Sequence, residues 1–141
     1  MPPPAPPPPL PAAAAGRLSV LLTEDNEDAA ATLADLLRML GHSVRIAGTA
    51  RAAVEAAARE LPDVLVCDVG LPDGSGYDVV RAVRAAPGGE GVVALALTGY
   101  AQPQDREEAL RAGFDAHLAK PPDLDRLLRF LEEAARRREG E

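Results

Sequence analysis

The chain has 141 residues, 47% of them hydrophobic but only 3% aromatic, which predicts one domain with a core of Ala, Val and Leu. Its formal net charge of −7 argues against direct binding to nucleic acid or to an anionic membrane, because both need a basic surface. No run approaches the roughly 18 consecutive apolar residues of a membrane span. The single cysteine, Cys67, excludes an internal disulfide and fits the reducing cytoplasm, where we expect the protein to act.

Residues 1–16 differ in composition from the rest of the chain. Eight of the first 11 residues are proline and four alanines follow, a composition that favours an extended polyproline II spacer with nothing to bury. We expect a disordered leader or linker, with a docking ligand for a proline-binding module as the alternative. The predicted domain spans residues 17–138, and residues 139–141 form a short tail.

From Leu18 onward, apolar runs alternate with segments of helical periodicity. Thr49 and Asp123 are candidate helix caps, and Gly41 and Gly113 are candidate helix stops. We expect strands at 18–23, 43–47, 64–67, 92–97 and 116–119, and helices at 24–40, 50–60, 77–86, 103–112 and 124–138. Five strands that alternate with five helices predict an α/β fold, with a doubly wound parallel sheet covered on both faces.

The stretch Val64–Gly76 stands at the centre of this pattern. Four apolar residues predict a fully buried strand, and they lead directly into Asp68 and a turn rich in Gly, Pro and Asp. In an open parallel sheet, ligands collect outside the carboxyl ends of the strands. The other predicted strands also end in chemically active residues, namely Glu24 and Asp25 after the first, Thr98 after the fourth and Lys120 after the fifth.

Each of these residues also has a purely structural interpretation. Glu24 and Asp25 suit the start of a helix, Thr98 suits a cap, and lysine side chains are usually solvated. Their occurrence together on one edge favours a site. Lys120 is also the only lysine among 15 basic residues, and lysine is a compact point charge that arginine does not replace.

Convergent carboxylates need a counterion, because like charges in one site oppose each other's ionisation. Mg²⁺ is suited to one or two carboxylates, with water or phosphate oxygens at its remaining positions. A carboxylate can also attack a phosphoryl group to form an aspartyl-phosphate, a reaction in which the protein mainly positions groups and neutralises charge. Lys120 and Thr98 would contribute an ammonium and a hydroxyl to such a site.

Residues 17–138 resemble the receiver domain of two-component response regulators. The residues of the second and third motifs given below resemble those of hybrid histidine kinase receivers. The resemblance implies a flavodoxin-like sheet with strand order 2-1-3-4-5. It rests on four motifs in order: Leu21-Leu22-Thr23-Glu24-Asp25-Asn26, Asp68-Val69-Gly70-Leu71-Pro72-Asp73-Gly74-Ser75-Gly76-Tyr77, Leu97-Thr98-Gly99-Tyr100 and Ala119-Lys120-Pro121.

The resemblance implies that Asp68 accepts a phosphoryl group from a histidine kinase or a phosphotransfer protein in a phosphorelay. Glu24 and Asp25 would hold Mg²⁺ together with Asp68 and the backbone carbonyl of Gly70. Lys120 would pair with the phosphoryl group. No enzymatic activity is expected beyond the domain's own phosphorylation and dephosphorylation.

The resemblance also implies a switch. Thr98 would move toward the phosphoryl group, and a downstream partner would bind the face formed by the fourth helix, fifth strand and fifth helix, roughly residues 103–138. The family also places a cis peptide where this chain has Lys120-Pro121. Where the family usually has Tyr or Phe, this chain has His117. It is either a switch residue, whose inward movement has a free-energy cost that depends on its charge, or a half-exposed strand histidine without that role.

Two residues flank the predicted phosphoryl group and should set its lifetime. Gly70 leaves an opening for hydrolytic water, and Tyr100 is expected to shield the group, so we expect slow self-dephosphorylation. Away from the site, we expect His42 to be a solvated loop residue and Cys67 to be a small core residue.

An aspartyl-phosphate hydrolase of similar topology is the alternative function. Such an enzyme would need a second Asp two residues after the nucleophile, where this chain has Gly70. Binding of a dinucleotide or flavin is less well supported, because no phosphate-binding Gly-rich loop follows the first strand. Both a stand-alone receiver and a receiver from a hybrid kinase fit the sequence.

Overall fold

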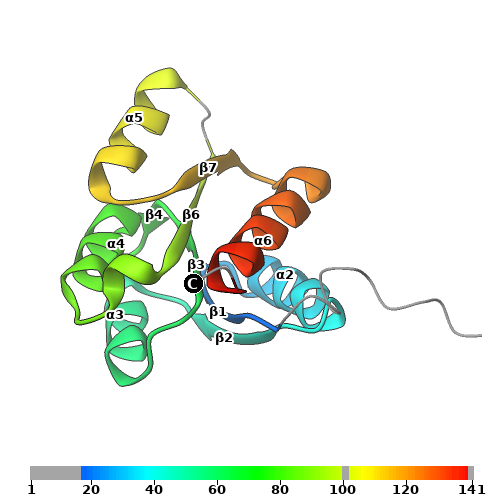
Figure 1. The fold of residues 1–141 in the computed structure, drawn as a ribbon. Coiled ribbons are helices and arrows are strands. Elements are labelled where there is room, and N and C mark those ends of the chain that lie inside the picture. The colour runs from blue at the N-terminus through cyan, green and yellow to red at the C-terminus, as the bar shows by residue number, and fades with distance from the viewer. Residues whose placement is uncertain (1–16, 100–101, 140–141) are drawn as a thin grey trace, which may run out of the picture.

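The structure is a computed structural model that describes residues 17–99 and 102–139. The expectations for the leader at 1–16 and for Tyr100 therefore concern residues outside the described part. The described chain folds around one parallel sheet flanked by helices (Figure 1). No helix in the described ranges is long and apolar enough to cross a membrane.

The five main strands lie in the order β2-β1-β3-β6-β7, and all neighbours are parallel. Counted along the chain, this is the order 2-1-3-4-5, so the predicted doubly wound, flavodoxin-like α/β fold is confirmed. The strands are β1 (Ser19–Thr23), β2 (Ser43–Ala47), β3 (Val64–Asp68), β6 (Val93–Thr98) and β7 (Ala116–Ala119).

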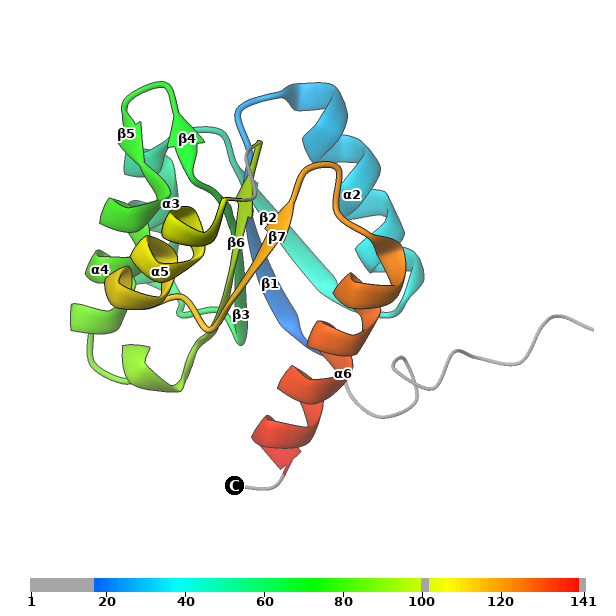
Figure 2. The same ribbon diagram turned by 90° about the horizontal axis from the view of Figure 1, so that it is seen from above.

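Helices cover both faces of the sheet. One face carries α2 (Glu27–Met39) and α6 (Leu124–Glu139), and the other carries α3 (Ala50–Arg59), α4 (Gly76–Ala85) and α5 (Pro103–Ala112) (Figure 2). Two small elements were not predicted. They are a hairpin of β4 (Gly70–Leu71) and β5 (Gly74–Ser75), and a 3₁₀ turn, η1 (Gly89–Gly91).

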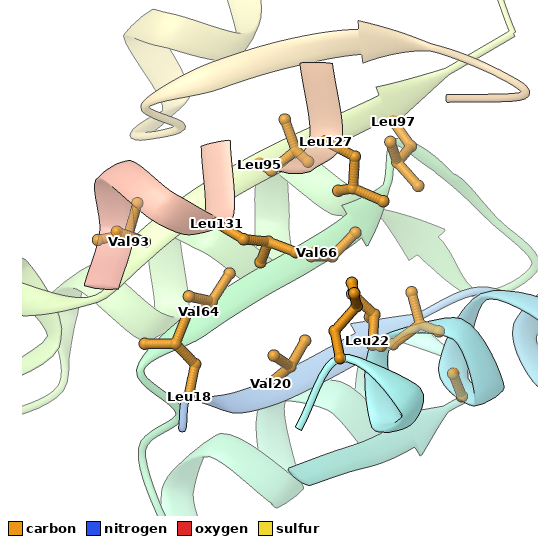
Figure 3. Packing of buried hydrophobic residues seen from close by; sticks show 14 of the residues in the cluster. Leu18, Val20, Leu22, Val64, Val66, Val93, Leu95, Leu97, Leu127 and Leu131 are labelled. Carbon is orange, nitrogen blue, oxygen red and sulfur yellow. The ribbon is translucent and has the colours of Figure 1, made fainter. Parts of the chain in front are cut away.

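The alternation of side chains along each strand divides the core into two layers. On β3, Val64 and Val66 face α2 and α6, whereas Leu65 and Cys67 face α3, α4 and α5. Figure 3 shows the first layer, where side chains from β1, β3 and β6 pack against Leu127 and Leu131 of α6. Because both faces of β3 are covered, all five of its residues are buried, as the apolar run predicts.

Short polar side chains fix where the helices begin. Asn26 accepts a hydrogen bond from the Ala29 amide at 3.0 Å, so α2 starts at Glu27. Glu24 and Asp25 therefore lie in the loop before this helix and not in its first turn. The Thr49 and Asp123 caps are as predicted, since their side chains accept from amide groups of α3 and α6.

His42 is buried, so the expectation of a solvated loop residue is wrong. Its side chain is 4% exposed, and its Nδ1 atom accepts a hydrogen bond from the Leu18 amide at 3.1 Å. The ring supplies an acceptor to an amide at the start of β1 that would otherwise be buried without one. Cys67 is fully buried, as expected for a core residue.

Candidate functional site

The carboxyl ends of the strands bring the predicted polar residues to one edge of the sheet. Asp68 is the last residue of β3 and lies in register with Leu97 of β6. Glu24 directly follows β1, where its amide donates to the Ala47 carbonyl at 3.1 Å. Both acidic residues are buried, with 6% of Asp68 and 5% of Glu24 exposed. Two buried carboxylates in one place require compensation by positive charge.

Lys120 provides that charge. Its Nζ atom donates to Asp68 Oδ2 at 2.7 Å and to the two Glu24 carboxylate oxygens at 2.9 and 3.2 Å. The backbone fixes the stem of the side chain, because the Lys120 amide donates to the Thr98 carbonyl at 2.8 Å. The peptide bond between Lys120 and Pro121 is cis, as expected.

Burial and charge act in opposite directions on this group of side chains. Burial, together with the neighbouring Asp68 carboxylate, raises the pKa of Glu24 despite the attraction of the Lys120 ammonium. For Lys120, burial alone would lower the pKa, but the hydrogen bonds to Asp68 and Glu24 outweigh it and raise the pKa. The ammonium therefore stays charged between the two carboxylates at neutral pH.

A third carboxylate completes an acidic cluster. One oxygen each from Glu24, Asp25 and Asp68 lie within 4.8 Å of one another, and Asp25 is exposed to solvent. This all-oxygen donor set fits a hard divalent cation such as Mg²⁺, which keeps several of its waters. Gly70 is exposed beside the cluster, and its amide donates to Asp68 Oδ1 at 3.2 Å. Thr98 is buried at the end of β6, next to β3 in the sheet.

Comparison with known proteins identifies the family of this chain. A family model described as the response regulator receiver domain matches residues 20–132. The chain belongs to this family.

Curated relatives of this receiver differ in their length. An uncharacterised 14.6 kDa protein of Leptolyngbya boryana is 38% identical over 117 residues, which are 83% of this chain and 89% of that protein. The probable transcriptional regulatory protein TcrX of Mycobacterium tuberculosis is 35% identical over 120 residues, 85% of this chain but 50% of that protein. The receiver thus spans about half the length of this regulator.

Solved structures are similar over the whole domain. The receiver domain of the sensor histidine kinase PA1611 from Pseudomonas aeruginosa, with a magnesium ion coordinated in its active-site cleft, is 35% identical with a TM-score of 0.77, and the match covers 85% of this chain and 98% of that one. The receiver domain of Saccharomyces cerevisiae Ssk1, in complex with the histidine phosphotransfer protein Ypd1, is 26% identical with a TM-score of 0.78, covering 84% and 89% of the two chains. The predicted resemblance to receivers, including those of histidine kinases, is confirmed.

His117 lies apart from the acidic cluster of this receiver, in the middle of β7. Its side chain is half-buried, and its Nε2 atom is buried without a hydrogen-bond partner in the described structure. Burial lowers the pKa of His117, Asp105 opposes this effect and Arg106 adds to it. The ring also lines a surface groove together with Arg106 and Leu110. A role for His117 in the switch stays a prediction.

An apolar groove of about 700 Å³, which was not predicted from the sequence, adjoins the site. One wall is the exposed side of α2, and the other is the Pro121-Pro122 segment that follows β7. Leu33 and Leu36, on the apolar face of α2, are the sequence feature from which this groove could have been predicted, because both are only partly buried and line it. The lining residues are Leu22, Glu24, Asp28, Ala29, Thr32, Leu33, Leu36, Leu97, Lys120, Pro121 and Pro122.

Proposed function

We propose that this receiver accepts a phosphoryl group on Asp68 from a phosphohistidine of a histidine kinase or phosphotransfer protein, in a reaction that depends on Mg²⁺. The observation that carries the proposal is the Lys120 ammonium, which bonds the buried Asp68 and Glu24 carboxylates at the carboxyl edge of the sheet. This arrangement presents the Asp68 carboxylate at the edge of the core, with positive charge beside it.

In the proposed reaction, an Asp68 carboxylate oxygen forms a bond to phosphorus as the bond between phosphorus and the donor's imidazole nitrogen breaks. The electron pair of that bond leaves with the imidazole, which takes a proton. Lys120 lies 2.7 Å from Asp68 Oδ2 and would neutralise charge on the transferring group. Glu24, Asp25, Asp68 and the Gly70 carbonyl would hold Mg²⁺, which supplies further positive charge to the phosphoryl oxygens.

The surface around Asp68 suggests how partners bind. The apolar groove between α2 and Pro121-Pro122 opens beside the phosphoacceptor and would receive the phosphoryl donor, as an amphipathic helix fits a hydrophobic groove. A downstream partner would bind the face formed by α5, β7 and α6, where Leu110 and Leu124 are exposed. Thr98 and His117 would couple the two surfaces, and Tyr100 and Gly70 would set the lifetime of the phosphoryl group.

Receiver domains are generally signalling domains and not enzymes, and we propose the same here. Gly70 offers no side chain that could serve as the general acid of a separate hydrolase. The negative net charge gives no support to direct contact with nucleic acid or membranes. The proposed location is the cytoplasm, which suits a chain whose single cysteine is free.

The proposal is tested by timed phosphotransfer from a panel of purified, radiolabelled histidine kinases. We expect close to one phosphoryl group per chain, loss of labelling when Mg²⁺ is chelated, and no labelling of the Asp68→Asn variant. Asp63→Asn is a suitable control, because Asp63 precedes the same strand at its opposite end. Labelling that persists in Asp68→Asn, or multiple turnovers of a chromogenic phosphate ester, would contradict the proposal.

A further inference from the structure

The β4–β5 hairpin, which follows Asp68, is hydrogen-bonded to the N-terminus of α3. Asp73 lies at the tip of the β4–β5 hairpin, and its two carboxylate oxygens accept hydrogen bonds from the Ala50 amide at 2.7 Å and the Arg51 amide at 3.0 Å. These are the first two amides of α3, which have no partner within the helix. Thr49, the residue directly before the helix, accepts a hydrogen bond from the Ala52 amide at 3.0 Å.

The other contacts of the hairpin are at its base, away from Asp73. Gly70 in β4 pairs with Ser75 in β5, and its amide donates to Asp68 Oδ1. A Cβ atom built at Gly70 would meet nothing within 4 Å, whereas the next residue, Leu71, is partly buried against the core layer of α3, α4 and α5. At the far end, the Gly76 amide donates to the Val69 carbonyl at 2.8 Å. The Ser75 hydroxyl accepts from the Asp78 amide of α4 at 3.3 Å, and the Asp73 carboxylate joins the hairpin tip to α3.

The electrostatics of this contact are favourable. A carboxylate at a helix N-terminus interacts well with the partial positive charge of the unpaired amides. The amides of Arg51 and Ala50 accordingly lower the pKa of Asp73, so the carboxylate is ionised at neutral pH. Gly74 continues the contact, because a Cβ atom there would lie 3.5 Å from the Cβ of Ala50.

We propose that Asp73 is a positioning residue for the phosphorylation site, which by capping α3 from the hairpin tip fixes the backbone carbonyl of Gly70 beside the acidic cluster. This inference rests on the proposed function, because it gives the Gly70 carbonyl its role as a ligand of Mg²⁺. Asp73 itself touches neither the metal nor the phosphoryl group. Its loss should leave Asp68, Glu24 and Lys120 in place while the hairpin samples other positions.

The expected effect is on metal affinity. If the hairpin occupies the binding position only about a tenth of the time, the apparent Kd for Mg²⁺ rises about tenfold. The maximal rate of phosphorylation at saturating Mg²⁺ should stay close to that of the wild type, because the metal selects the correct position. The Mg²⁺ dependence of the rate, and not the maximal rate, is therefore the informative quantity.

The experiment compares Asp73→Ala, Asp73→Asn and Thr49→Ala with the wild type. Thr49→Ala is the matched control, since it removes a cap from the same helix without releasing the hairpin. We expect Mg²⁺ titration calorimetry to give an approximately tenfold weaker Kd for Asp73→Ala, an intermediate value for Asp73→Asn, which keeps one acceptor oxygen, and an unchanged value for Thr49→Ala. Circular dichroism should show all three variants folded, because Asp73 is exposed.

Amide hydrogen exchange in the metal-free proteins separates this inference from the proposed function. Faster exchange of residues 70–75 in Asp73→Ala, but not in Thr49→Ala, is expected whether or not Asp68 accepts phosphate. An unchanged Mg²⁺ affinity in Asp73→Ala, or an equal weakening in Thr49→Ala, would overturn the positioning role. Wild-type protein that binds Mg²⁺ but is not labelled at Asp68 would overturn the proposed function alone.

Discussion

The sequence predicted that Lys120 lies beside the acidic residues of this site, and the structure places it there. The residues at the strand ends follow apolar runs directly, so the sheet topology alone brings Glu24, Asp68 and Lys120 together. His42 and Asp73 were beyond such reasoning. Each accepts hydrogen bonds from amides distant in the chain, and a local pattern contains no information about those amides.

The burial of His42 predicts a pH-dependent stability. Burial lowers the pKa of His42 below its ordinary value near 6.5, so the fold favours the neutral ring. The stability contribution is complete above the unfolded-state pKa and is lost as the pH falls through that value toward the folded-state pKa. Urea unfolding at pH 7.5 and 5.5 should show a loss of at most about 1.4 kcal/mol from this group.

The matched variants for this measurement are His42→Gln and His117→Gln. His42→Gln should be less stable than the wild type at pH 7.5 but should lose less stability on acidification. His117→Gln should keep most of the wild-type pH dependence, since His117 is only half-buried. Equal pH dependence in the wild type and His42→Gln would refute this assignment.

At the level of elements, the long strands and helices followed from periodicity, whereas the short elements did not. The hairpin β4–β5 and the turn η1 comprise strands of two residues and a helix of three, too short to carry a repeating pattern. The sequence cluster around Gly74 and Gly76 predicted a turn. It did not reveal that α4 begins against the backbone at the end of β3, the strand that carries Asp68.

That close approach makes Gly76 sensitive to substitution. A Cβ atom at Gly76 would lie 2.5 Å from the Asp68 carbonyl oxygen and 3.0 Å from the Cα of Val69, so the backbone would have to shift. Gly76→Ala should lower the free energy of unfolding by roughly 1–3 kcal/mol, as overpacking does, and should slow labelling of Asp68. Gly91→Ala is the control, because a Cβ there meets nothing within 4 Å. Equal effects of the two substitutions would argue against this explanation.

Across the whole molecule, the two edges of the sheet differ in how they are held together. At the edge opposite the site, Arg84 donates to the carbonyls of Gly113, Gly89 and Val92 and forms an ion pair with Asp115 at 2.9 Å. At the site edge, acidic side chains converge around one ammonium. The alternation of strands and helices predicted the overall fold, but it could not predict these edge contacts, which join segments far apart in the chain. The limits of the leader and the tail stay predictions.

The converging carboxylates predict that Mg²⁺ stabilises the fold. A ligand that binds only the folded state at 100 times its Kd adds about 2.7 kcal/mol, so Tm should rise with Mg²⁺ concentration. Because the fold raises the pKa of Glu24, its charge opposes folding as the pH rises above 4.5. Metal-free Glu24→Gln should therefore be at least as stable as the wild type at pH 7.

The same variant should respond less to the metal. Thermal unfolding of Glu24→Gln should show a smaller rise of Tm with Mg²⁺, whereas Glu27→Gln, which alters an exposed residue in the first turn of α2, should respond like the wild type. A Tm of the wild type that does not change with Mg²⁺ would contradict the predicted metal site.

The position of Cys67 makes the central strand experimentally traceable. It is the only thiol in the chain, it is fully buried beside Asp68, and burial raises its pKa to about 12. A thiol reagent therefore reacts with the protein only while β3 is transiently separated from its covering helices. The modification rate therefore reports how often the strand that ends in Asp68 opens, and no engineered label is needed.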